Sequence, residues 1–364
     1  MITLLRWDEE GERFLSITAT SPRASSLHVL TAAGGGAFVK REVCAEHPGD
    51  VRGAAWAPCE LSGGLFAVAC GDGRVYLWEQ RLGTWGPAAS ERAAAGGGAG
   101  SLLPGAKSSA ATARDFAPPH VGLQLAVGGG DGVVRVLACE DADEPTREGA
   151  WATREELAAG AGAVAAVAWC RAPGGAAMLA TAAAAAAPVP AARGGGSHAP
   201  LTPAGAVLVW ARTADAPPAR PPRWVALLRL EGHAGPVRGL SWAPAAGRPA
   251  QMLASLGEWV GRGEPALCLW AVAPAGEPRG AAGGRGAAAR ERAVAYLAEA
   301  GLRGAVQLPG ATVGAALVAV NTAPRGSTQV EWDGSGVTVA CGVDPEEGAV
   351  RVLRENLAGD WADD

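Results

Sequence analysis

Tryptophan positions constrain the fold of this chain most strongly, because they recur at fixed places in a repeat. The segment from His47 to Trp56, followed by Ala-Pro, returns as His233 to Trp242 with the same nine-residue step and the same Ala-Pro. Four shorter versions of this marker surround Trp7, Phe116, Trp169 and Trp332. The chain therefore contains six repeat units, and the repeat must be explained before any single element.

Each unit continues with strand-like segments separated by tight turns such as Asp72-Gly73 and Asp131-Gly132. The predicted second strands are Leu65–Ala69, Leu125–Val127, Met178–Ala180, Met252–Ala254 and Val337–Ala340. The predicted third strands are Arg74–Trp78, Val133–Leu137, Val207–Trp210, Ala266–Trp270 and Ala349–Leu353. Fourth strands are expected to begin near Trp85, Trp151, Trp224 and Trp361. Four short strands per unit are typical of propeller blades.

The repeat predicts an all-β fold, a six-bladed WD-repeat β-propeller that forms a single domain over residues 1–364. A β-sandwich is the alternative, but it would not need this recurrence at the level of whole blades. Ala/Gly/Pro-rich loop insertions are expected at about 86–113, 182–206 and 274–285. Residues 287–300 have the composition of a marginal helix, and Trp259 is expected in a loop outside the repeat.

Composition argues against several function classes. The net charge is −5, with 31 basic and 36 acidic residues, and the arginines form no stripe that would follow a phosphate backbone, so we expect no nucleic-acid binding. The start of the chain does not resemble a secretory signal, and the apolar run Ala182–Ala187 is too short to cross a bilayer, so we expect an intracellular protein without direct membrane insertion. The seven cysteines occur singly, which predicts free thiols and no metal site.

Candidate chemical sites in the sequence are better explained by structure. The glycine-rich stretch Gly128–Gly132 precedes a predicted strand rather than a helix, so it is interpreted as a hairpin turn and not as a phosphate loop. His47 and His233 occupy equivalent repeat positions, and a catalytic residue has no reason to recur in each blade. We expect both histidines to join hydrogen-bonded networks with turn aspartates such as Asp72 and Asp131. No catalytic residue and no cofactor is expected, and a propeller enzyme or ligand binder is the less favoured alternative.

Two segments resemble a known family. The stretch Phe116–Ala126 with Asp131–Val136 resembles the third blade of WD-repeat nucleoporins of the sec-thirteen homologue family, and Ala243–Arg248 is similar to the fifth blade. The resemblance implies a scaffold subunit in the Y-shaped outer-ring complex of the nuclear pore at the nuclear envelope, with helical nucleoporins as partners and a role in protein and mRNA transport. The related sec-thirteen propeller also serves a vesicle coat, and a nutrient-signalling complex at the lysosome or vacuole surface stays a further alternative. This sequence departs from the family in lacking Trp-Asp at the third-strand ends, as in Trp78-Glu79.

The ends of the chain add an expectation about partner binding. The first blade strand begins almost at the first residue, and the last predicted strand begins only at Trp361. We therefore expect an open propeller whose flanking edges, formed by Ile2, Thr3, Leu4 and Leu5 at one end and by Val350 and Val352 at the other, receive β-strands from an α-helical scaffold nucleoporin. The resemblance implies the same arrangement.

Overall fold

The computed structural model describes most of the predicted repeat. The described residues are 2–7, 13–21, 24–33, 37–48, 51–62, 64–71, 73–81, 84–87, 111–147, 149–160, 162–172, 176–183, 187–188, 201–202, 205–212, 223–244, 250–258, 264–274, 304–308, 313–325, 327–342, 350–356 and 359–364. They form antiparallel β-sheets and one short 3₁₀ helix, Pro119–Val121. Two compact units, Met1–Glu156 and Leu157–Asp364, are described separately below.

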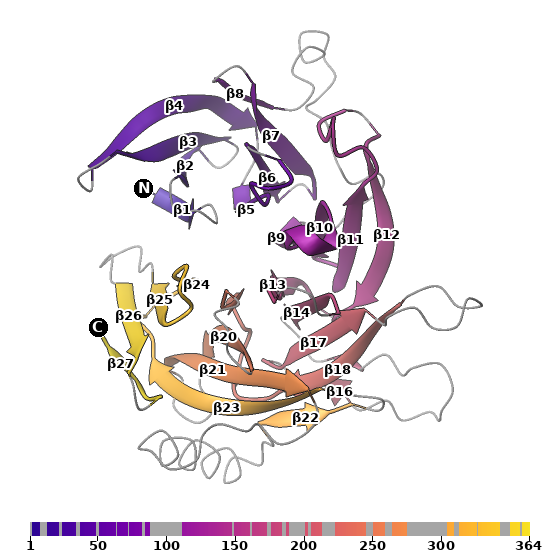
Figure 1. Cartoon of the computed structure of the whole chain (residues 1–364), viewed down its shortest axis with the longest axis vertical. Coiled ribbons are helices and arrows are strands. Elements are labelled where there is room, and N and C mark those ends of the chain that lie inside the picture. Colours follow the sequence, from indigo (N-terminus) through magenta and orange to yellow (C-terminus); the bar gives the residue numbers. More distant parts are fainter. Residues whose placement is uncertain are drawn as a thin grey trace. The chain divides into compact units, whose positions relative to one another are not determined.

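The first unit contains three sheets of four strands in chain order (Figure 1). The first sheet comprises β1 (Ile2–Trp7), β2 (Arg13–Ser21), β3 (Ala24–Ala33) and β4 (Ala37–Pro48). The second comprises β5 (Val51–Trp56), β6 (Leu65–Cys70), β7 (Val75–Arg81) and β8 (Thr84–Pro87). The third comprises β9 (Ala111–Phe116), β10 (Gln124–Gly129), β11 (Val133–Cys139) and β12 (Trp151–Ala158), whose last two residues already belong to the second unit.

The second unit repeats this plan with one addition. Its first sheet comprises β13 (Val164–Trp169), β14 (Met178–Ala183), β17 (Val207–Arg212), β18 (Trp224–Leu230) and a fifth strand, β22 (Ala305–Gln307). The next comprises β19 (Gly239–Trp242), β20 (Gln251–Glu258), β21 (Pro265–Pro274) and β23 (Val313–Thr322). The last comprises β24 (Gln329–Trp332), β25 (Thr338–Gly342), β26 (Val350–Glu355) and β27 (Trp361–Asp363). A separate hairpin pairs β15 (Ala187–Pro188) with β16 (Leu201–Thr202).

Neighbouring sheets within a unit pack face to face, and β6 shows why the sequence requires this. All six residues of β6 are buried, although side chains of a strand point alternately to its two faces. Leu65, Ala67 and Ala69 join a core with the third sheet, whereas Phe66, Val68 and Cys70 join a core with the first sheet. A strand covered on both faces needs a continuous apolar run, and this is the pattern of the second strands.

The all-β propeller class predicted from the repeat is confirmed, with one correction to the blade count. The structure shows five blades of four strands each instead of the six predicted. The remaining large sheet among the described residues departs from the four-stranded plan, because it carries β22 as a fifth strand. The second and third strands begin within one residue of the predicted positions, and Ala349, the predicted first residue of the last third strand, lies outside the described residues. Whether the propeller is open stays a prediction, as does its description as a single domain.

The insertion boundaries also need correction. The insertion predicted at 86–113 is shorter at both ends, since β8 extends to Pro87 and β9 begins at Ala111. The stretch 182–206 includes the end of β14 and the hairpin of β15 and β16. Pro274, the first residue of the stretch 274–285, belongs to β21. Trp259 and the predicted helix at 287–300 lie outside the described residues.

Candidate functional site

His233 lies at the centre of a buried network rather than in an open site. Its Nε2 atom is 2.8 Å from the Ser255 hydroxyl, which also accepts a hydrogen bond of 2.9 Å from the indole Nε1–H of Trp270. All three residues are buried. Gly257 makes room for the imidazole, because a Cβ there would lie 3.0 Å from two ring atoms of His233. The network therefore fixes one side chain of each of the strands β20 and β21 to the segment before β19.

The protonation state of His233 follows from its burial. Removal from water disfavours the charged imidazolium and lowers the pKa of His233 to about 4, although hydrogen bonding at the ring acts in the opposite direction. The ring is therefore neutral at pH 7. A buried neutral histidine that already bonds a serine hydroxyl is suited to holding strands together.

A related contact occurs in the preceding sheet of the same unit. Trp210 on β17 donates its Nε1–H to the hydroxyl of Thr181 on β14 at 2.9 Å. Thr181 and Ser255 each lie on a second strand, and Trp210 and Trp270 each lie on a third strand. The sequence analysis missed these hydroxyl partners, yet a signal was available, since a Thr or Ser interrupts the apolar run of the second strand in both sheets.

The other predicted network residues are placed differently. Asp72 lies outside the described residues, and His47 is described only as backbone at the end of β4, where it pairs with Ser25. The hydrogen-bond partner of His233 Nε2 is the hydroxyl of Ser255 and not the carboxylate of a turn aspartate. A role for His47 and Asp72 in a shared network stays a prediction.

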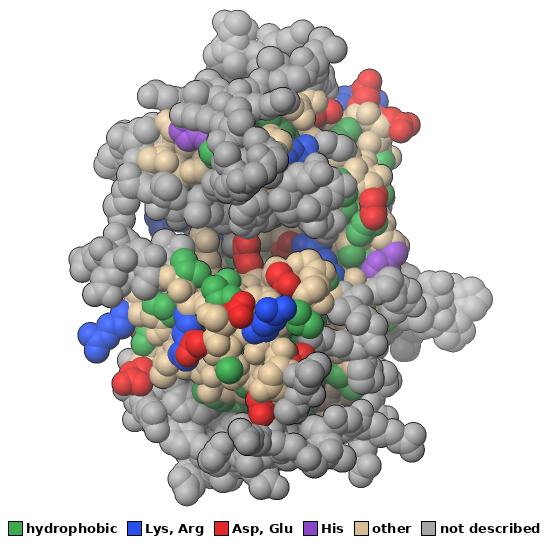
Figure 2. Space-filling model, turned by 60° about the vertical axis from the view of Figure 1, so that its left-hand side comes forward, with side chains coloured by type: hydrophobic (Ala, Val, Ile, Leu, Met, Phe, Trp, Pro, Cys, Tyr) green, Lys and Arg blue, Asp and Glu red, His purple; other side chains and the backbone are tan. Residues whose placement is uncertain are grey.

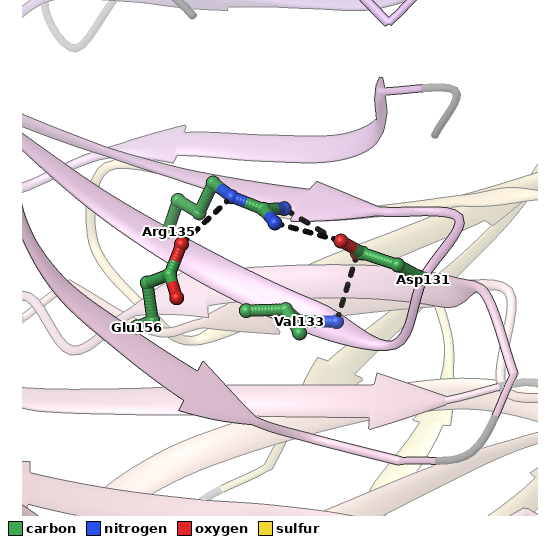
Figure 3. Close-up of polar contacts among 4 residues, drawn as sticks. All are labelled: Asp131, Val133, Arg135 and Glu156. Carbon is green, nitrogen blue, oxygen red and sulfur yellow. Dashed lines mark hydrogen bonds and ion pairs between the residues drawn. The ribbon is translucent and has the colours of Figure 1, made fainter. Parts of the chain in front are cut away.

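Asp131 forms the centre of a surface contact in the first unit (Figure 3). It lies in the turn between β10 and β11, where Gly132 has a φ of 80° that favours glycine. Its carboxylate accepts the Val133 N–H at 3.1 Å and forms an ion pair of 2.7 Å with Arg135, which also donates to Glu156 on β12 at 3.1 Å. Partial burial would raise the pKa of Asp131, but the hydrogen bonds from Arg135 and Val133 lower it below its usual value of 3.8. The contact joins a hairpin turn to the outer strand.

The predicted edge residues fall on two kinds of strand. Ile2, Thr3, Leu4 and Leu5 belong to β1, which lies at an edge of its sheet and pairs with β2. The assignment of Val350 and Val352 to an edge strand is wrong, because β26 lies between β25 and β27. The register pairs Leu353 with Asp363 and Glu355 with Trp361, so the last strand covers the outer side of β26. Val350 is nevertheless 60% exposed.

The described thiols lie in or beside several different sheets. Groups of three or more His, Cys, Asp or Glu side chains arranged to hold a metal do not occur in this part of the chain. Burial raises the pKa of the Cys170 thiol and of the Cys341 thiol to about 11. Figure 2 shows acidic and basic side chains next to one another across the coloured part of one face. Among the described helices none is long and apolar enough to cross a membrane.

Comparison with known proteins gives one informative similarity. No protein-family model matches the chain. The chain is 32% identical over 143 residues to the protein SEC13 homolog of Drosophila melanogaster. The match spans 39% of this chain and 35% of that relative, so the chain covers about a third of the relative's length. The match and the propeller blades agree with a WD-repeat propeller that is similar to the SEC13 homolog over the matched residues.

Proposed function

We propose that this chain is a non-catalytic scaffold subunit of a large protein assembly, and that this assembly is the outer ring of the nuclear pore complex. In this role the protein supports nucleocytoplasmic transport by binding helical nucleoporins and holding them in place. The similarity to the SEC13 homolog is the observation that carries the proposal. It agrees with the WD-repeat blades found throughout the described residues.

The surroundings of the polar residues singled out in the sequence support a non-catalytic role. His233 is buried and neutral at pH 7, and its Nε2 bonds Ser255. Asp131 bonds the turn that contains it and forms an ion pair with Arg135. The polar atoms of both residues thus form hydrogen bonds or ion pairs that hold neighbouring segments together. This is a structural role.

The proposed partner is an α-helical scaffold nucleoporin that contributes β-strands. β1 is an edge strand of its sheet, so its outer backbone groups are suited to main-chain hydrogen bonds with an added strand. Main-chain pairing gives affinity with little dependence on side chains. Such pairing suits a scaffold interface that depends on backbone geometry more than on the recognition of particular side chains.

Affinity purification of the tagged full-length chain from the cells that express it, with partners identified by mass spectrometry, tests the proposal. We expect outer-ring nucleoporins in amounts comparable to the tagged chain. A parallel purification of a coat subunit from the same cells provides the matched comparison. Recovery of coat subunits or of a lysosome- or vacuole-surface complex, without outer-ring nucleoporins, would overturn the nuclear-pore assignment while keeping the scaffold class.

A further inference from the structure

The loop between β23 and β24 presents an arginine and a threonine to solvent. Arg325 stands three residues before Thr328, and both side chains are exposed. Within the part of the chain that the structure describes, neither side chain takes part in a hydrogen bond or an ion pair. β24, the first strand of its sheet, begins directly after Thr328. The loop therefore offers a cation and a hydroxyl group at a spacing of three residues.

Ser327 is the other hydroxyl residue next to Arg325, and it is not accessible. It is 4% exposed, and its hydroxyl donates to the carbonyl oxygen of Pro324 at 2.6 Å. The backbone N–H of Ser327 donates to the same oxygen at 3.2 Å. The turn that begins at Pro324 thus holds the serine hydroxyl inside and leaves the hydroxyl of Thr328 outside.

An exposed arginine three residues before an exposed hydroxyl is a pattern that arginine-directed protein kinases recognise. Such kinases select their substrates by charge pattern. Carboxylates of the kinase form charge-assisted hydrogen bonds with the guanidinium, and the hydroxyl three residues later then reaches the catalytic centre. Arg325 supplies an available guanidinium and Thr328 an available hydroxyl.

Other places in the chain have the same spacing but a different structure. They are Arg13 to Ser16, Arg23 to Ser26, Arg81 to Thr84 and Arg238 to Ser241. All four hydroxyl residues belong to strands, namely β2, β3, β8 and β19, whereas Thr328 belongs to none. Two of the arginines are also engaged, since Arg13 lies over the ring of Trp56 and Arg238 forms an ion pair with Glu258. A kinase must bind the main chain around the hydroxyl, so pairing within a sheet opposes phosphorylation.

We propose that Thr328 is a phosphorylation site for an arginine-directed protein kinase, which recognises the chain through Arg325. The hydroxyl oxygen of Thr328 bonds to the γ-phosphorus of ATP, and the bond from this phosphorus to the bridging oxygen breaks. ADP leaves, and the hydroxyl proton passes to the catalytic aspartate of the kinase. The inference goes beyond the proposed scaffold function and does not depend on the nuclear-pore assignment.

The phosphate adds charge at a junction between two sheets of the second unit. A Cβ at Gly239 on β19 would lie 3.3 Å from the carbonyl oxygen of Thr328, so the backbone there packs closely on the preceding sheet. The exposed side chain of Thr328 points away from the core, in which Val330 is buried. A charge of about −1.5 to −2 at this side chain therefore changes what the loop can bind and leaves the fold intact.

Phosphorylation of the purified full chain tests the proposal. The probe is calcium/calmodulin-dependent protein kinase II, an arginine-directed kinase, with ATP, and mass spectrometry locates the phosphate. We expect phosphate on Thr328 and none on Ser327. Arg325→Ala should lower the initial rate at least about tenfold, because the charge-assisted contact is lost. Gln329→Ala, the matched control on the other side of Thr328, should leave the rate unchanged.

Three results would overturn the proposal. The first is no phosphate on Thr328 of the folded chain, and a peptide of residues 322–331 in the same assay then shows whether the fold or the sequence prevents the reaction. The second is an equal rate for the wild type and for an Arg325→Ala variant whose near-ultraviolet circular dichroism matches it. The third is the absence of phosphate on Thr328 in chain isolated from cells treated with a phosphatase inhibitor.

Discussion

The indole Nε1–H of Trp242 donates to the carbonyl oxygen of Ala168 at 3.2 Å, and this bond joins the first strands of two neighbouring sheets. The same relationship returns one sheet later, where Trp332 donates to Ser241 O at 2.9 Å. In both cases the acceptor directly precedes the marker tryptophan of the sheet before. The marker residue thus fills a core and also bonds to the preceding blade, which explains why an indole recurs at this position.

Replacement of Trp242 separates its packing from its hydrogen bond. We expect Trp242→Ala to lower the free energy of unfolding by about 3–5 kcal/mol through lost burial and the cavity left behind. Trp242→Phe keeps an aromatic ring but removes the donor to Ala168, and should cost about 1–2 kcal/mol. Urea denaturation followed by fluorescence measures both, with Thr328→Ala, an exposed position, as the control. Wild-type stability of Trp242→Phe would contradict a role for the hydrogen bond.

Loss of the Ser255 hydroxyl should be more damaging than loss of the Thr181 hydroxyl. Ser255→Ala leaves both His233 and Trp270 without this buried partner, and an unsatisfied buried polar group costs about 1–3 kcal/mol. Thr181→Ala affects only Trp210 in the same way. Thermal denaturation gives the order, and Thr181→Ser, which keeps the hydroxyl, serves as the matched control. The reverse order of the two alanine variants would show that the serine does not organise the network.

Acid should destabilise the protein through His233 in a defined pH range. The pKa of this histidine is 6.5 in the unfolded chain and about 4 in the folded protein, so between these values the unfolded state binds the additional proton. Stability is therefore complete above pH 6.5 and falls as the pH decreases toward 4, by roughly 3 kcal/mol in total. The midpoint of urea unfolding across this range measures the effect. His233→Gln should remove most of the slope, and an unchanged slope would mean that the histidine is not buried as described.

The stability of the turn that contains Asp131 should depend more on Gly132 than on the ion pair of Asp131 with Arg135. Asp131→Asn weakens a partly exposed ion pair, whose contribution is at most about 1 kcal/mol and should decrease further in high salt. Gly132→Ala forces a residue with a Cβ into the left-handed region, at a cost of about 1–2 kcal/mol. Thermal midpoints of the two variants at low and high salt test this order. A larger effect for Asp131→Asn at both salt concentrations would reverse the argument.

The blade strands were predictable because their signals are local. The signals of a turn such as Asp131-Gly132 and of an apolar second strand such as Leu65–Ala69 depend on neighbouring residues alone. Both elements occur, and the strand extends one residue further, to Cys70. The boundaries of the insertions were less accurate, because the Ala-rich composition of the predicted insertions continues into strands such as β9 and β14.

Contacts between distant segments could not be derived from pattern alone. The choice of Ser255 as the partner of His233 depends on which hydroxyl the folded sheet brings within reach. β22 has only three residues and pairs with a strand far away in the sequence, so a periodic pattern could not predict it. The sequence analysis assigned Val350 and Val352 to an edge because few residues follow the start of the strand expected at Trp361. In the structure the three residues of β27 suffice to pair with β26.

Localisation of the chain, tagged at its endogenous locus, is the most direct test of the proposal that it is a scaffold of the nuclear pore outer ring. Super-resolution imaging in interphase cells, with an outer-ring nucleoporin and a coat subunit labelled in separate colours, compares the two assemblies within one cell. The proposal predicts puncta along the nuclear rim that coincide with the nucleoporin. Cytoplasmic puncta that coincide with the coat subunit or lie on lysosomes or vacuoles, without signal at the nuclear rim, would contradict it.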